Sequence, residues 1–168
     1  MKLSMYQASV PTFVRMLGNL AVILDKAAAH AEARKIDPAV FVGGRLFPDM
    51  LPLAKQVQIA TDHAKGAAAR LSGQQPPRYE DTESSFPELA ARIGKTVDYL
   101  QTFSAEQIDG SDERRVSVSI RSKTLDFRGA EYLVNYALPN FYFHVTTAYA
   151  ILRHGGVDIG KSDFIGSV

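Results

Sequence analysis

Apolar residues recur at helical spacing in four long segments of this chain. The first runs from about Ser4 to Lys35, and the second from about Asp49 to Ser72. The third follows the sequence Ser85-x-x-Glu88, which has the form of a helix capping box. The fourth runs from about Gly129 to Arg153. In each segment the apolar side chains lie three and four positions apart, so each is predicted to be a helix with one buried face.

Several residues mark the expected ends and breaks of these helices. Asp49 is a plausible N-cap of the second helix, with Pro52 in its first turn. Pro11 should either kink the first helix or mark its true first turn, and Pro139 predicts a break or kink in the last helix. The tail after the last helix is punctuated by glycines and carries Phe164 as an apolar anchor.

Before the last helix the apolar pattern changes to a period of two. Val116, Val118 and Ile120 alternate with polar residues, and Leu125 and Phe127 alternate after a short polar turn. This pattern predicts a two-stranded hairpin. Because an isolated hairpin is only marginally stable, we expect it to lie on the helices.

Together these elements predict an all-α protein, a four-helix bundle with a small β-hairpin inserted before the last helix. The length of 168 residues favours one domain over residues 1–168. The connection between the second and third helices, and the longer one between the third and fourth, permit a crossover topology.

Composition excludes several classes of function. The chain has no cysteine, which excludes disulfides, thiolate catalysis and cysteine-ligated metals. Its formal net charge of +1 provides no overall field for a nucleic acid or an anionic membrane, so neither is an expected partner. No run approaches the roughly 18 apolar residues of a membrane span, and no signal peptide is recognisable at the start, so we expect a cytoplasmic protein.

Two histidines on different helices are predicted to face the centre of the bundle. On a helical wheel, Asn140 and Thr147 lie within about 60° of His144, and Gln56 lies within the same angle of His63. Facing helices of a bundle build ligand and metal sites from such side chains, so these residues are the candidate ligand pocket. The simplest alternative is a hydrogen-bonded buried pair, since buried imidazoles need partners. General acid–base chemistry is a further alternative, because histidine titrates near physiological pH.

The segment "HVTTAYAILRHGG" resembles the fourth-helix signature of the DinB/YfiT-like superfamily. In that signature a histidine is followed nine residues later by arginine and twelve later by glycine, which His144, Arg153 and Gly156 match. The segments "RLFPDMLPLAKQVQIATDHAK", "YALPNFYFHVTTAYAILRHGG" and "GKSDFIG" resemble an uncharacterised domain-of-unknown-function family within or near that superfamily. The resemblance covers essentially the whole chain and implies a DinB-like four-helix bundle.

The resemblance also implies a metal site. Typical members present one histidine from the second helix and an H-x-x-x-H pair from the fourth helix to a divalent metal such as Zn, Ni, Mn or Fe. Some are thiol-dependent transferases or isomerases. Carried over, His63 and His144 would be metal ligands, and the third ligand would fall on Asn140. Asparagine is a poor ligand for first-row metals, and a catalytic zinc site normally has three good protein ligands.

We therefore interpret the chain as a DinB-like bundle that binds a small molecule around His63 and His144, with the usual three-histidine site degenerate. One alternative is a metal-dependent, thiol-dependent transferase or hydrolase. Another is a non-enzymatic dimeric interaction module. The sequence identifies no catalytic residue and no particular ligand.

The last helix is apolar almost all round, so it must be covered on both sides. The hairpin or the tail could cover it. The alternative is a two-fold interface using Tyr142 and Tyr149, because aromatic residues suit such interfaces. On this basis we predict a homodimer.

Overall fold

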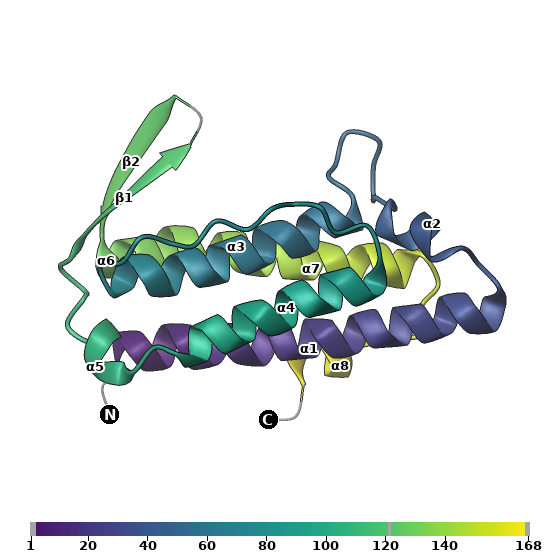
Figure 1. Ribbon diagram of the computed structural model, residues 1–168, viewed down its shortest axis with the longest axis horizontal. Helices are drawn as coiled ribbons and strands as arrows, with labels where there is room; N and C mark the ends of the chain where they lie inside the picture. The colour runs from purple at the N-terminus through teal and green to yellow at the C-terminus, as the bar shows by residue number, and fades with distance from the viewer. Residues whose placement is uncertain (1–2, 121, 167–168) are drawn as a thin grey trace.

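The computed structural model describes residues 3–120 and 122–166. Its long helices run side by side as a bundle (Figure 1): α1 (Met5–Arg34), α3 (Leu53–Leu71), α4 (Phe86–Gln101) and α7 (Leu138–His154). The shorter elements are α2 (Pro38–Val42), α5 (Ala105–Ile108), β1 (Arg115–Ile120), β2 (Lys123–Arg128), α6 (Gly129–Glu131), the π-helical η1 (Tyr132–Ala137) and α8 (Lys161–Ile165). The predicted all-α fold, a four-helix bundle with a hairpin before its last helix, is confirmed.

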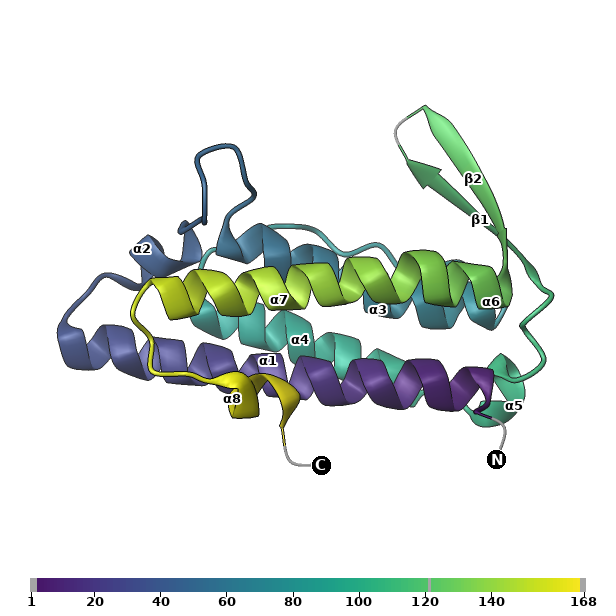
Figure 2. The same ribbon diagram turned by 180° about the vertical axis from the view of Figure 1, so that it is seen from behind.

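The four long helices form two layers. α3 packs against α7 and α4, and α1 packs against α4 and α7. After α3 ends, the chain runs back along the length of the bundle to begin α4 (Figure 1). This long return is one of the crossovers that the sequence permits. It places α3 and α7 together in one layer, with α1 and α4 in the other (Figures 1 and 2).

Large apolar side chains from all four helices fill the core. The ring of Phe13 on α1 meets that of Phe141 on α7 edge to face, with 4.9 Å between their centroids. Other fully buried side chains are Leu17, Leu20, Ile23, Leu24, Leu53, Leu71, Leu89, Ile93 and Leu100. Among the described helices, α1 alone is long and apolar enough to cross a membrane. Its apolar face is buried against the other helices, as in the core helix of a bundle.

The second long helix begins later than the sequence predicts. Asp49 is not its N-cap: α3 begins at Leu53, with Pro52 in the capping position and no side-chain cap. The residue before a proline is disfavoured in helical conformation, so Leu51 cannot belong to the helix that Pro52 introduces. Residues 43–52 form a projecting loop instead (Figure 1). The first helix, α1, begins at Met5, so Pro11 lies inside the helix and does not mark its first turn.

The predicted hairpin is present, but only its base lies on the helices. β1 and β2 pair antiparallel, with Val118 opposite Leu125. Val116 and Val118 are buried, whereas Ile120 and Leu125 near the tip are 39% and 37% exposed. The hairpin projects from one end of the bundle, on the same side as the loop 43–52 at the other end (Figures 1 and 2).

The C-terminal tail covers one side of α1 and α7. α8 lies along α1 (Figure 2), where Lys26 forms an ion pair of 2.6 Å with Asp163 and Asn19 donates to the carbonyl of Phe164. The ring of Phe164 packs edge to face on that of Tyr149, with 5.8 Å between centroids. The tail is therefore one of the covers that the apolar last helix requires.

Candidate ligand site between α3 and α7

The structure brings the rings of His63 and His144 together where α3 meets α7. They are stacked, with 5.9 Å between centroids and 14° between planes, and both are half-buried. A chain of contacts extends in both directions from this pair. We call its residues the α3–α7 seam: Gln56, His63, Gly66 and Arg70 from α3, and Tyr132, Tyr136, Asn140 and His144 from η1 and α7.

Gln56 determines which nitrogen of His144 carries the proton. The amide Nε2 of Gln56 donates to the carbonyl of Leu51 at 3.0 Å, which leaves Oε1 facing the imidazole. Oε1 lies 2.7 Å from His144 Nδ1. Because an amide oxygen only accepts, Nδ1 must be the protonated nitrogen. In the neutral ring, Nε2 of His144 is then a free hydrogen-bond acceptor.

Both histidines are held in their neutral form. Burial lowers the pKa of His63 from 6.5 to about 4, and the charges of Arg70, Lys65 and, at the acidic pH where it is protonated, His144 act in the same direction. Burial also lowers the pKa of His144. Loss of solvation disfavours the charged imidazolium, so at neutral pH the pair presents uncharged nitrogens.

The other two predicted pocket residues direct their polar hydrogens to their own helix. Asn140 Nδ2 donates to the carbonyl of Tyr136 at 2.7 Å, and Thr147 Oγ1 donates to the carbonyl of Phe143 at the same distance. Of the five predicted residues, the structure therefore joins His63, His144 and Gln56 directly. Asn140 and Thr147 lie beside them but stabilise the backbone of α7.

Two tyrosines of the seam were not predicted. The ring of Tyr136 lies 5.7 Å from that of His63, and Tyr132 stacks on Tyr136 at 5.8 Å. Both belong to the π-helix η1, in which each turn holds more residues than an α-turn. A wheel drawn at 100° per residue through this region therefore misplaces every residue before Leu138. The one sequence signal is Pro139, whose missing N–H disturbs the preceding turn.

An apolar groove adjoins the histidines. The ring of Phe143 lies 5.2 Å from that of His144 and is 57% exposed. With Pro139 and Tyr142 it forms one wall of a groove of about 470 Å³, whose other wall is Leu46 and Met50 of the loop 43–52. The predicted interface residue Tyr142 thus lines a groove, while Tyr149 lies under the tail.

The sequence profile of the domain of unknown function DUF1993 matches residues 5–165. The chain belongs to the DUF1993 family. No curated protein matches this chain. A crystal structure of a DinB family member protein from Shewanella denitrificans is 42% identical to this DUF1993 chain, with a TM-score of 0.88 over 97% of this chain and 92% of that one. The resemblance to a DinB-like family of unknown function is therefore confirmed.

The donors in this DUF1993 protein do not fit the three-ligand metal site of typical DinB-like proteins. In the described part of the chain, no three or more His, Cys, Asp or Glu side chains are grouped so as to hold a metal. Asn140, at the position of the third ligand, donates its amide to a backbone carbonyl. A lone pair of imidazole lies in the ring plane, and two stacked rings do not direct theirs at one point between them. These residues therefore do not form the three-ligand metal site.

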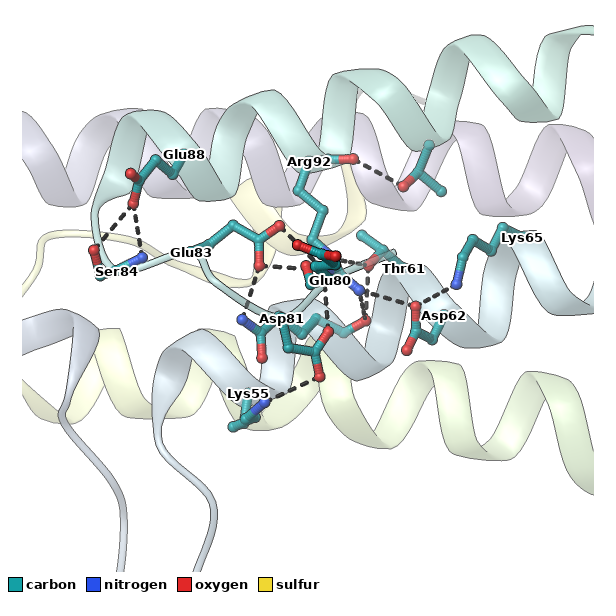
Figure 3. A network of polar contacts seen from close by, with 12 residues as sticks. Lys55, Thr61, Asp62, Lys65, Glu80, Asp81, Glu83, Ser84, Glu88 and Arg92 are labelled. Carbon is teal, nitrogen blue, oxygen red and sulfur yellow. Dashed lines mark hydrogen bonds and ion pairs between the residues drawn. The ribbon is translucent and has the colours of Figure 1, made fainter. Parts of the chain in front are cut away.

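Figure 3 shows a second polar cluster that was not predicted from the sequence. The guanidinium of Arg92 on α4 is almost fully buried and contacts three carboxylates, those of Asp62, Asp81 and Glu83, at 2.9 to 3.1 Å. Its Nε donates to Thr61 at 2.8 Å. These contacts attach the connection between α3 and α4 to both helices, so we interpret the cluster as structural.

Proposed function

We propose that this DUF1993 protein binds, at the α3–α7 seam, a small organic molecule that carries a hydrogen-bond donor. In this proposal His63 and His144 recognise a polar group of the molecule, and the groove beside Phe143 accepts its apolar part. The observation that carries the proposal is the pair of neutral, half-exposed imidazoles, one of which has its acceptor nitrogen fixed by Gln56.

The free nitrogens of the pair favour this interpretation over a purely structural role. Within residues 3–120 and 122–166, His144 Nε2 and both ring nitrogens of His63 have no protein hydrogen-bond partner. These nitrogens remain in contact with solvent, because the buried side-chain atoms without a partner among the described residues are Gln58 Oε1 and Ser111 Oγ. They are therefore accessible to a ligand, whereas structural histidines usually have protein partners. A partner supplied by a ligand would satisfy them.

The chemistry of the site defines the ligand class. A neutral Nε2 accepts a hydrogen bond, so the ligand must supply an O–H, N–H or S–H group. The adjoining groove is apolar, so the rest of the ligand is an alkyl or aryl body. An alcohol or thiol on a small hydrocarbon skeleton meets both conditions.

Three probes of nearly the same shape test this proposal: benzyl alcohol, benzyl mercaptan and ethylbenzene, which lacks the donor. Titrations followed by calorimetry or NMR should show that the alcohol binds about fivefold to tenfold more tightly than ethylbenzene, the effect of one hydrogen bond. The thiol is a weaker donor and should bind with an affinity between the two. His144→Phe should remove the difference. His154→Phe, at the exposed end of α7, is the matched control and should preserve it. Equal affinities for all three probes in the wild type would refute the proposal.

Metal analysis separates the proposal from a metal-dependent transferase or hydrolase. Protein purified without a His tag should contain Zn, Ni, Mn and Fe at levels near zero, unchanged by His63→Ala. One equivalent of metal that disappears in His63→Ala would refute our interpretation of the donors and favour the metal-dependent alternative.

A further inference from the structure

Arg70 lies at the far end of the seam and is folded flat against α3. Its Nη1 stands 2.5 Å from the position that a Cβ of residue 66 would occupy, so any other residue at this position would require the end of the Arg70 side chain to shift. The same Nη1 donates to the hydroxyl of Tyr132 at 3.2 Å. Glycine inside a helix costs about 1 kcal/mol relative to alanine. Gly66 thus destabilises α3 slightly, and its missing side chain leaves space for the guanidinium of Arg70 on the seam.

This cation has no carboxylate partner in the part of the chain that the structure describes. Arg70 is half-buried, and its guanidinium donates a hydrogen bond to the fully buried phenol of Tyr132. Arg92, in the same bundle, shows the usual solution for a buried guanidinium, because three carboxylates surround it. Arg70 keeps contact with solvent, so its charge is accessible to an anion from outside, whereas the charge of Arg92 is already matched within the protein.

A small polar pocket opens beside this guanidinium. It has a volume of about 230 Å³ and is lined by Arg70, Gln74 and Gln75 together with Arg115 and Ser117 of β1. Arg115 and Ser117 already bond the carboxylate of Asp126, at 3.2 and 2.5 Å. Arg70 is therefore the cation in this pocket whose charge is not already matched by a carboxylate of the described chain.

We propose that Arg70 binds the carboxylate or phosphate group of a small anionic ligand that extends along the seam. The inference rests on the proposed function and narrows its ligand class. Gly66, over which the guanidinium lies, follows His63 by three residues, a rise of about 4.5 Å along the helix. The guanidinium of Arg70 thus lies about one turn of α3 beyond His63. Between them the half-buried ring of Tyr136 offers an aromatic surface.

Benzoate and its neutral isostere benzamide test the inference at constant ionic strength. The wild type should bind benzoate about tenfold or more tightly than benzamide, because a planar guanidinium forms charge-assisted bonds to a carboxylate. Phenyl phosphate tested beside benzoate decides which oxyanion is preferred. Arg70→Gln should abolish the preference for the anion. Arg153→Gln, an exposed arginine at the other end of α7, is the matched control and should not change it.

A second variant keeps the test valid if Arg70→Gln fails to fold. Gly66→Ala improves helix propensity and displaces the guanidinium, so it should fold at least as stably and still weaken benzoate binding. In the wild type, bound benzoate should also raise the NMR-measured pKa of His63, because it neutralises a positive charge that lowers this pKa. A rise that persists in Arg70→Gln would contradict the inference.

The outcomes distinguish the inference from the proposed function. If benzyl alcohol binds through His144 but benzoate shows no preference over benzamide, the anion inference is wrong and the proposed function stands. If benzoate binding depends on Arg70 while His144→Phe changes nothing for any probe, the anion site stands and the proposed function is wrong. If no probe binds, both are wrong.

Discussion

Acid should destabilise the bundle through His63. Its pKa is about 4 in the folded protein and 6.5 in the reference state that represents the unfolded chain. The unfolded chain therefore binds a proton more readily than the folded one below pH 6.5. By linkage, the stability contributed by neutral His63 is fully present above pH 6.5, declines as the pH falls, and is lost completely below pH 4.

The size of the effect follows from the two pKa values. A difference between 6.5 and about 4 corresponds to a loss of about 3 kcal/mol below pH 4 and about 2 kcal/mol by pH 5. These are upper bounds, because the ring is half-buried and water screens part of its charge. His144 has a lowered pKa as well, so it should add a smaller loss in the same direction.

Urea unfolding at pH 7.5 and pH 5.0 measures this loss in the wild type and in His63→Gln. Glutamine is polar and does not titrate, so the variant should lose less stability between the two pH values by about 1–2 kcal/mol. His154→Gln removes an exposed histidine and should behave as the wild type does. If the wild type and His63→Gln lose equal stability between pH 7.5 and pH 5.0, the reasoning about burial of His63 is refuted.

Two further predictions concern the rest of the molecule. Arg92→Met should reduce the free energy of unfolding by about 1.5–3 kcal/mol in urea titrations, because it removes the charge-assisted hydrogen bonds that attach the connection between α3 and α4. Arg128→Met at an exposed ion pair should change it by less than about 1 kcal/mol, and similar losses would show that the cluster is not structural. For the predicted homodimer, light scattering at micromolar concentration should give twice the chain mass, and Tyr142→Ala and Tyr149→Ala should disrupt association while circular dichroism still shows a folded bundle. Because Tyr149 lies under the tail, Phe143→Ser on the exposed side of α7 is the more direct test of that surface, and an unchanged dimer in all three variants would exclude it.

The fold was predictable because long helices and alternating strands leave strong periodic signals. The apolar stripes gave the four helices, and the period of two between Val116 and Phe127 gave the hairpin. The errors lie where a local rule or tertiary contact decides. Pro52 prevents a helix from beginning at Asp49, and only the base of the hairpin finds a surface on which to pack.

The candidate site was predictable only where the helix is regular. A wheel at constant angle correctly turned His63 and His144 toward each other, because α3 and the part of α7 around His144 are ordinary α-helix. It could not place Tyr132 or Tyr136, which precede the return to α-helical spacing. Arg92 was missed because one charged residue beside an apolar stripe resembles a surface position. The acidic run at residues 80–83 was the available signal of its partners.

The departures from ordinary helical structure are concentrated on one seam. Gly66 weakens α3 where the guanidinium of Arg70 lies, and the π-helix η1 carries both tyrosines of the same surface. The histidine pair between them has ring nitrogens without protein partners in the described chain. Elsewhere in the bundle, the buried guanidinium of Arg92 has three carboxylate partners, as is usual for a buried charge. Natural proteins tend to break local rules at functional sites, and π-helical turns are frequent there. Independent costs that coincide on one face are therefore better explained by a ligand than by chance.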